Sequence, residues 1–287
     1  MERAFVPMAM FLALSMPTCF VVGASVSTPG EAQGEKPKIL LLTHSQGYKH
    51  GSLPVAERVV KKVAEESGAF EVFSLEGYRQ ESEAIDLSMI SAEYLAQFDA
   101  VMFYTTGELP LDDSQKKALI DFVKEGKAYI GIHSATDTFY TWKGYGELVG
   151  AYFAAHGPNQ LTLNLKIEDG HHPATRMLGD SWEIADEFYR FGKASDDEKR
   201  PVAFSRDRLH ILMSVDTERS DLSGQGMEKG GDYALAWCQN FGEGRSFYTA
   251  LGHRDDVWEN PVYQQHLLGG ILWALGRREG DASLSGK

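Results

Sequence analysis

The first half of the chain repeats one pattern, in which an apolar run ends in a polar loop and an amphipathic segment follows. The segments Pro54–Glu66 and Asp112–Glu125 carry apolar residues at helical spacing, and Asp112 and Gly126 suit the two ends of the second helix. Continuous apolar runs are typical of central parallel strands buried on both faces. Strand, helix and strand at this spacing predict an α/β fold with a doubly wound, mostly parallel sheet and right-handed crossovers. The expected strands are Lys38–Thr43, Phe70–Leu75, Phe98–Thr105 and Ala128–Ile132.

Beyond Gly157 the pattern changes to one that favours added β-strands. Gln160–Ile167 alternates apolar and polar residues, as a half-buried strand does. Tyr233–Phe241 and Arg245–Leu251 are joined by a short glycine-containing turn and predict a hairpin. We expect these segments to extend the same sheet in the C-terminal half, together with a strand at His210–Val215 and a closing helix at Asn260–Leu275.

Both ends of the chain differ in composition from the predicted domain. Residues 1–24 contain an early Arg3, an apolar core at Met8–Leu14 and small residues before position 25, which is typical of a secretion signal peptide. We therefore expect a periplasmic or secreted protein with no membrane span after cleavage. The expected division is a signal peptide at 1–24, a flexible linker at 25–36, one domain at 37–278 and a disordered tail at 279–287.

Charge and cysteine content narrow the classes of partner. A net charge of −13 over 287 residues argues against nucleic acid, whose phosphates require a basic face, and against an anionic membrane surface. A neutral or cationic small molecule, or a metal ion, is compatible with this charge, as is a solvated acidic surface without a partner. Cleavage of the signal peptide would leave Cys238 as the sole cysteine, which excludes an intrachain disulfide in the mature protein.

Histidines gather at the ends of the predicted strands. Because the carboxyl ends of parallel strands meet at one edge of a sheet, side chains from the following loops are expected to converge. Neutral imidazoles bind divalent metals, with zinc favoured. The alternative is that each histidine is a structural or surface residue, since no His-Glu-x-x-His or His-x-His pair identifies a metal. The candidate metal ligands are His44 and His50 after the first strand, His133 after the fourth, and His253 after Arg245–Leu251.

Four side chains are candidates for catalysis. The turn Gly131-Ile132-His133-Ser134-Ala135 stands where a nucleophile elbow would place Ser or Cys, yet its central residue is His133. Either carboxyl of the Asp186-Glu187 pair, set among apolar residues, could be a buried acid suited to proton transfer, or both could face water. The candidates are His133, Ser134, His156 and Glu187.

Three aromatic residues and one carboxylate in the same loops are candidates for substrate binding. Their rings could stack on sugar rings, or could belong to the core instead. The first strand is followed by neither a Gly-x-Gly-x-x-Gly turn nor a phosphate-binding loop, which argues against a nucleotide site. The candidates are Tyr48, Asp137, Trp142 and Tyr189.

Several stretches, spread in order over residues 38–277, together resemble the trehalose-utilisation (ThuA-like) family. They are Thr43-His44-Ser45-x-Gly47-Tyr48-x-His50, Gly131-Ile132-His133-Ser134-Ala135-Thr136-Asp137, Leu148-Val149-Gly150-x-Tyr152-Phe153-x-x-His156, His172-Pro173, Asp186-Glu187-x-Tyr189, Gly244-Arg245-x-Phe247-Tyr248, Leu251-Gly252-His253 and Trp273-Ala274-Leu275-Gly276. The resemblance implies a flavodoxin-like sheet similar to the class I glutamine amidotransferase domain, with His133 at the position of the amidotransferase cysteine.

The resemblance also implies a role in disaccharide or glycoside metabolism, linked to 3-keto sugars made by a partner oxidoreductase. We expect an exported enzyme, a lyase, isomerase or hydrolase acting on a small-molecule carbohydrate, in which a histidine-rich pocket performs acid–base chemistry with or without a divalent metal. The alternatives are a sugar-binding or accessory module without turnover and, less favoured, an amidotransferase-like hydrolase that uses Ser134.

Overall fold

The computed structural model describes residues 1–2, 35–157, 161–192 and 200–285. The chain divides into two units, 1–35 and 36–287, and the second holds every helix and strand described here. The expected signal peptide at 1–24 and the expected linker at 25–36 fall almost wholly outside the described residues, so both stay predictions. Within the described part of the chain, no helix is both long enough and apolar enough to span a membrane.

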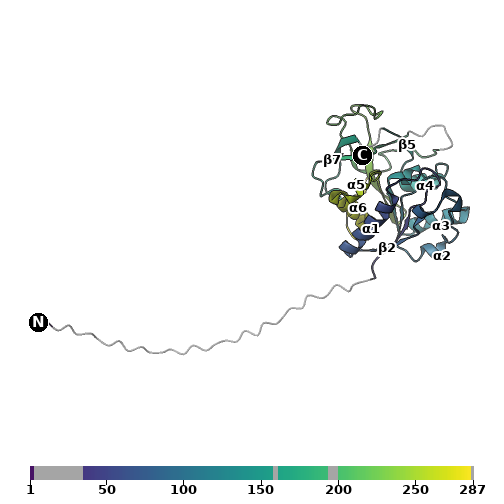
Figure 1. Ribbon diagram of the computed structural model, residues 1–287, viewed down its shortest axis with the longest axis horizontal. Helices are drawn as coiled ribbons and strands as arrows, with labels where there is room; N and C mark the ends of the chain where they lie inside the picture. Colours follow the sequence, from purple (N-terminus) through teal and green to yellow (C-terminus); the bar gives the residue numbers. More distant parts are fainter. Residues whose placement is uncertain (3–34, 158–160, 193–199, 286–287) are drawn as a thin grey trace. The chain divides into compact units, whose positions relative to one another are not determined.

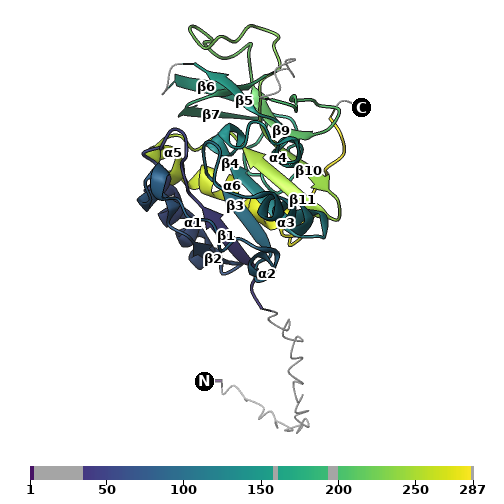
Figure 2. The same ribbon diagram turned by 90° about the vertical axis from the view of Figure 1, so that its right-hand side faces the viewer.

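The centre of the fold is a sheet with the strand order β2-β1-β3-β4-β11-β10-β9-β6-β7. Figures 1 and 2 show the ribbon from two sides, and most strands of this sheet are labelled in Figure 2. The first five strands in this order run parallel, and the remaining ones pair antiparallel. The parallel strands are β1 (Lys38–Leu42), β2 (Glu71–Ser74), β3 (Ala100–Phe103), β4 (Ala128–Ile132) and β11 (Gly244–Thr249). The antiparallel extension is formed by β10 (Ala234–Phe241), β9 (His210–Val215), β6 (Leu161–Ile167) and β7 (Ser181–Asp186).

This arrangement confirms the predicted mixed α/β architecture and explains how the two halves of the sequence meet. β3 and β4 are buried at every residue, as expected for central parallel strands with helices on both faces. The predicted hairpin forms between β10 and β11, and β11 then joins the edge of the parallel half beside β4. A small second sheet, β5 (Phe153–His156) paired with β8 (Tyr189–Phe191), was not predicted from the sequence.

Helices cover both faces of the sheet. Figure 2 shows α1 and α6 on one side of the parallel strands and α3 and α4 on the other. The α-helices are α1 (Leu53–Ser67), α2 (Ala92–Leu95), α3 (Asp113–Lys124), α4 (Lys143–Val149), α5 (Asp255–Glu259) and α6 (Pro261–Ala274). Three short 3₁₀ turns lie at Gly77–Arg79, Ser82–Ala84 and His133–Asp137. Asp112 caps α3 as predicted, in a reciprocal capping box with Gln115.

The part of the expected tail that the structure describes makes hydrogen bonds with β9 and the residue before it. The backbone amide of Ser285 donates to Leu209 O at 3.2 Å, and Ser285 Oγ accepts from Ile211 N at 2.7 Å. The ring nitrogen Nδ1 of His210 lies 2.6 Å from Ser283 O. Residues up to Ser285 therefore pack against β9, because tertiary hydrogen bonds order a segment whose polar composition alone favours disorder.

Candidate functional site

Four side chains of metal-ligand type converge at the carboxyl edge of the parallel strands. One ligand atom from each of His50, His133, Glu187 and His253 lies within 4.8 Å of all the others. His50 comes from the loop after β1, His133 directly follows β4, and His253 follows β11, so these three arrive as the parallel topology predicts. Glu187 arrives from the other half of the sheet, just after β7.

His133 is oriented by the strand beside it. β11 pairs with β4 up to Thr249 and Ile132, which places the backbone of Ala250 next to the His133 ring. Its Nδ1 lies 2.7 Å from Ala250 O, and a carbonyl can only accept, so Nδ1 carries the proton. The lone pair of Nε2 then faces the cluster, 3.4 Å from Glu187 Oε2 and 3.3 Å from His253 Nδ1. This outward N–H to a backbone carbonyl is how metal-binding histidines are commonly held.

The other two imidazoles differ in their electrostatics. Burial lowers the pKa of His50 to about 2, with further lowering from His133 and His253, so His50 is neutral. Its buried Nδ1 has no hydrogen-bond partner among the described residues. For His253, burial acts to lower the pKa, but the Glu187 carboxylate 3.3 Å from its Nδ1 raises it overall.

Glu187 is the anion of this cluster. Burial acts to raise its pKa, but the neighbouring His133 and His253 bring the pKa well below the usual range, so the group is a carboxylate. Its Oε1 lies 3.2 Å from Nδ1 of His156, whose side chain is 43% exposed. The pairing of β5 with β8 explains this contact, since His156 stands opposite Tyr189, two residues after Glu187.

The structure also separates the roles of the two adjacent carboxyls. Glu187 lines the cavity, whereas Asp186 points into the protein and is fully buried. Asp186 Oδ2 accepts a hydrogen bond from Gly252 N at 2.7 Å. Burial raises the pKa of Asp186 to about 6, against opposing effects of His133 and the Gly252 amide.

A cavity of about 310 Å³ opens next to the cluster. One wall is aromatic: the Tyr189 ring lies 4.3 Å from the His133 ring and 4.4 Å from the Phe153 ring, between centroids. Tyr48 lies at the solvent side and is 65% exposed. The cavity is lined by Tyr48, His50, Asp137, Phe153, His156, Glu187, Tyr189 and His253. Phe153 was missed in the sequence, although the aromatic stretch before His156 pointed to it.

Asp137 brings a second carboxyl to this cavity. Burial raises its pKa, while a hydrogen bond from the Tyr140 hydroxyl to Oδ1 works in the opposite direction. The cavity therefore offers the carboxyl of Asp137 in addition to the anionic Glu187. Polar groups and flat apolar rings in one cavity are features of sites that bind small molecules.

Three of the predicted site residues lie outside both the ligand cluster and the cavity lining. His44 is fully buried, and its ring packs so closely on Gly77 that a Cβ there would lie 2.4 Å from Cγ of His44. Ser134 is fully buried as well, and its Oγ has no partner among the described residues. Trp142 stacks on Tyr145 with 5.8 Å between ring centroids, on the side of α4. Their roles as a metal ligand, catalytic residue and sugar contact therefore have no support in the geometry.

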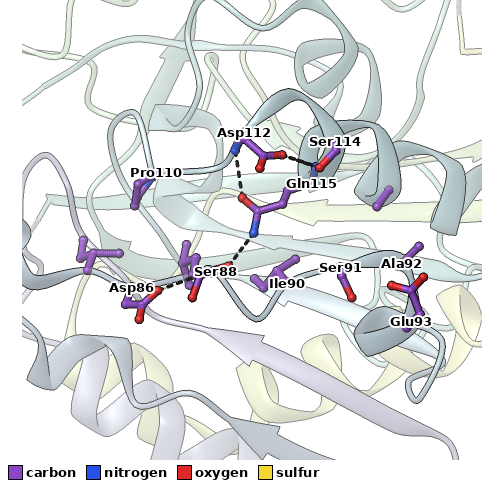
Figure 3. Close-up of a pocket in the computed structure, with 13 residues that line it drawn as sticks. Asp86, Ser88, Ile90, Ser91, Ala92, Glu93, Pro110, Asp112, Ser114 and Gln115 are labelled. Carbon is purple, nitrogen blue, oxygen red and sulfur yellow. Dashed lines mark hydrogen bonds between the residues drawn. The ribbon is translucent and has the colours of Figure 1, made fainter.

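A larger cavity lies between α2 and the start of α3, but its polar groups serve the local structure (Figure 3). Gln115 closes the capping box with Asp112 and donates to Leu87 O at 2.7 Å. Asp86 accepts from the amide of Ser88 at 2.9 Å. Because these groups already have partners, we read this cavity as a junction between two loops.

Comparisons with known proteins agree with this architecture. The family model for trehalose utilisation (ThuA) matches residues 38–274. The fold is similar to that of a ThuA-like protein from Parabacteroides merdae, with a TM-score of 0.67, 19% identity, and coverage of 86% of this chain and 92% of that one. A ThuA-like protein from Bacteroides uniformis has a TM-score of 0.65 and 17% identity, with coverage of 86% of this chain and 95% of that one. A cytoplasmic protein from Salmonella typhimurium has a TM-score of 0.53 and 10% identity, with coverage of 83% of this chain and 98% of that one. No curated protein matches the sequence.

Proposed function

The chain belongs to the trehalose-utilisation (ThuA) family, and from this premise we propose that it is an exported, metal-dependent enzyme acting on a disaccharide or glycoside. The observation that carries the proposal is the convergence of His50, His133, His253 and Glu187 within 4.8 Å. We propose that the substrate is a 3-keto sugar, supplied by a sugar oxidoreductase, and that the reaction is an elimination or isomerisation.

The donor set suits a divalent ion, with zinc favoured. Imidazole nitrogens and carboxylate oxygens are ligands typical of zinc, which can expand from four ligands to five and so accept a substrate oxygen or water. His133 already directs its Nε2 lone pair into the cluster, and the buried Nδ1 of His50 has no other partner among the described residues. When bound, such an ion would polarise a carbonyl or hydroxyl oxygen of the substrate.

His156 is suited to move the proton. It contacts the Glu187 carboxylate at 3.2 Å yet remains partly exposed at the cavity. Its Nδ1 lies 2.6 Å from Gly157 O, which accepts the Nδ1 proton and leaves Nε2 as the basic nitrogen. The hydrogen on C2 of a 3-keto sugar is acidic because it lies next to the carbonyl. A base can therefore remove it, and Nε2 of His156 is the proposed base.

The remaining lining residues would hold the sugar. Tyr189 and Phe153 present ring surface next to His133, and the Asp137 carboxyl can accept hydrogen bonds from hydroxyl groups. In this proposal His156 and the metal ligands carry out the chemistry, and the aromatic wall orients the substrate.

The test is elemental analysis of the purified protein followed by turnover of a panel of 3-keto glycosides. We expect about one divalent ion per chain, held by the single cluster of ligand type in the described residues. His50→Ala and His133→Asn should lose the ion; Asn is chosen because position 133 has a φ of +44°, which Asn tolerates better than Ala. His171→Ala, at an exposed position, is the matched control and should retain both the ion and activity.

His156→Ala separates metal binding from proton transfer. We expect this variant to keep the ion and to lose turnover by about 10²- to 10⁴-fold, the usual contribution of a general acid or base. The proposal would be refuted by wild-type protein that takes up no divalent ion. Sugar binding without product from any member of the panel would show a binding module rather than an enzyme.

A further inference from the structure

We infer that the backbone of Gly252 is a junction that sets the spacing of the metal-binding loops, and that Asp186, Tyr104 and Ser52 are positioning residues acting through it. The inference deepens the proposed function, on which its metal-binding consequence rests. The Gly252 junction is defined here as the Gly252 N–H and C=O with the side chains of Asp186, Tyr104, Ser52 and Trp258.

Both polar groups of the Gly252 backbone are engaged by buried side chains. The N–H donates to Asp186 Oδ2 at 2.7 Å. The carbonyl accepts from Trp258 Nε1 at 2.8 Å and from the Tyr104 hydroxyl at 2.9 Å, which fills its two lone pairs. Ser52 Oγ completes the group, 2.7 Å from the Tyr104 oxygen and 3.3 Å from the carbonyl. One residue thus receives contacts from segments that are far apart in the sequence.

Three of these segments carry a ligand of the cluster. Asp186 immediately precedes Glu187, Ser52 follows His50 by two residues, and Gly252 itself immediately precedes His253. The fourth ligand is tied to the same stretch of backbone, because His133 Nδ1 donates to Ala250 O at 2.7 Å. A displacement of Gly252 would therefore change the relative positions of all four ligands at once.

Two features go beyond the ordinary pairing of buried polar groups. Asp186 is a fully buried carboxyl whose Oδ1 has no hydrogen-bond partner among the described residues, an arrangement that costs free energy where an apolar residue would not. Gly252 has a φ of +125°, which residues with a Cβ rarely adopt. Costly groups of this kind persist where the surrounding structure requires the geometry they impose.

The test compares variants that differ in one bond to the junction. Tyr104→Phe removes the hydroxyl bound to Gly252 O, and its matched control is Tyr263→Phe, an equally buried tyrosine whose hydroxyl donates to Leu251 O at 3.2 Å, one residue away. Asp186→Ala removes the acceptor of the Gly252 amide, whereas Asp186→Asn keeps an acceptor oxygen and should restore function.

Two measurements are made on each variant. In chelator competition, Tyr104→Phe and Asp186→Ala should weaken zinc affinity by about 10- to 100-fold, the usual loss for residues that orient metal ligands, while Tyr263→Phe and Asp186→Asn stay near the wild type. In metal-free protein, amide hydrogen exchange at Gly252 and His253 should accelerate in Tyr104→Phe and Asp186→Ala only.

The outcomes separate this inference from the proposed function. If the wild-type protein binds no zinc, the proposed metal site is refuted. Amide hydrogen exchange in the metal-free variants still tests whether the Gly252 junction exists. Unchanged exchange at Gly252 in Tyr104→Phe and Asp186→Ala overturns the junction, even if zinc binds. If Asp186→Asn loses as much zinc affinity as Asp186→Ala, then the charge of Asp186 matters and not its hydrogen bond to Gly252. That result overturns the role given to Asp186.

Discussion

Replacement of Gly252 by alanine is expected to destabilise the protein and to weaken the metal site together. The new Cβ would lie 3.0 Å from the Tyr263 hydroxyl, 3.3 Å from Trp258 and 3.4 Å from Ile132, so at least two neighbours must shift. Overpacking of this kind costs about 1–3 kcal/mol. Holding a residue with a Cβ at a φ of +125° costs about 1–3 kcal/mol more. The expected loss in free energy of unfolding is therefore about 2–6 kcal/mol.

A second glycine separates the two contributions. Gly126 has a φ of +112°, close to that of Gly252, but a Cβ there would have nothing within 4 Å. Gly126→Ala therefore carries the backbone cost alone, about 1–3 kcal/mol, and leaves the metal ligands in place. Urea unfolding of both variants in metal-free protein gives the two free energies, and zinc competition gives the affinities.

The difference between the two variants measures what the packing around Gly252 contributes. We expect Gly252→Ala to lose about 1–3 kcal/mol more than Gly126→Ala and to bind zinc more weakly, whereas Gly126→Ala binds it normally. Equal losses of stability, with zinc affinity unchanged in Gly252→Ala, would refute the reasoning, because the contacts around Gly252 would then be neither tight nor connected to the ligands.

Three further predictions concern groups outside the metal cluster. Burial acts to raise the pKa of Glu168, but hydrogen bonds from Arg206 and Ser214 lower it overall. The ionised Glu168 therefore stabilises the folded protein fully above its unfolded pKa of about 4.3. This stabilisation is lost as the pH falls through the lower pKa of the folded state. Glu168→Gln should therefore cost about 2 kcal/mol at pH 7 in urea unfolding, with the gap from the wild type closing in acid; a gap independent of pH would contradict this. Tyr48→Ala, at a 65% exposed position, should leave the melting temperature unchanged but weaken sugar affinity by about 1 kcal/mol in calorimetry, and unchanged affinity would exclude Tyr48 from the binding surface. Burial raises the pKa of the Cys238 thiol, so a thiol reagent should label this residue only after unfolding, and rapid labelling of the native protein would contradict its burial.

Local sequence pattern determined the strands and the long helices of the parallel half. Ala128–Ile132 was expected as a buried strand and is β4 with the same bounds, because a run of apolar residues can be satisfied only between two covered faces. The placement of His50, His133 and His253 at one edge followed from the same pattern, since parallel strands bring their carboxyl ends together.

Pairing between distant segments decided the rest of the site. β5 and β8 are short, and their pairing sets His156 opposite Tyr189; periodicity within either segment does not contain that information. The same holds for the pair Asp186-Glu187, whose two carboxyls look equivalent in the sequence. Only the packing of the Gly252 segment against the end of β7 turns one inward and the other to the cavity.

The loop after β1 shows where local sequence pattern stops and tertiary contacts begin to decide the structure. The sequence by itself placed His44 and His50 in one polar loop at the functional edge, because the strand before them ends there. It could not distinguish them, since an irregular loop has no period that fixes side-chain direction. In the folded protein Gly77 accommodates the His44 ring, while His50 faces His133 at 4.9 Å between ring centroids. Sequence determined which edge carries the chemistry, and tertiary contacts decided which of its side chains meet, because those contacts come from segments far away in the chain.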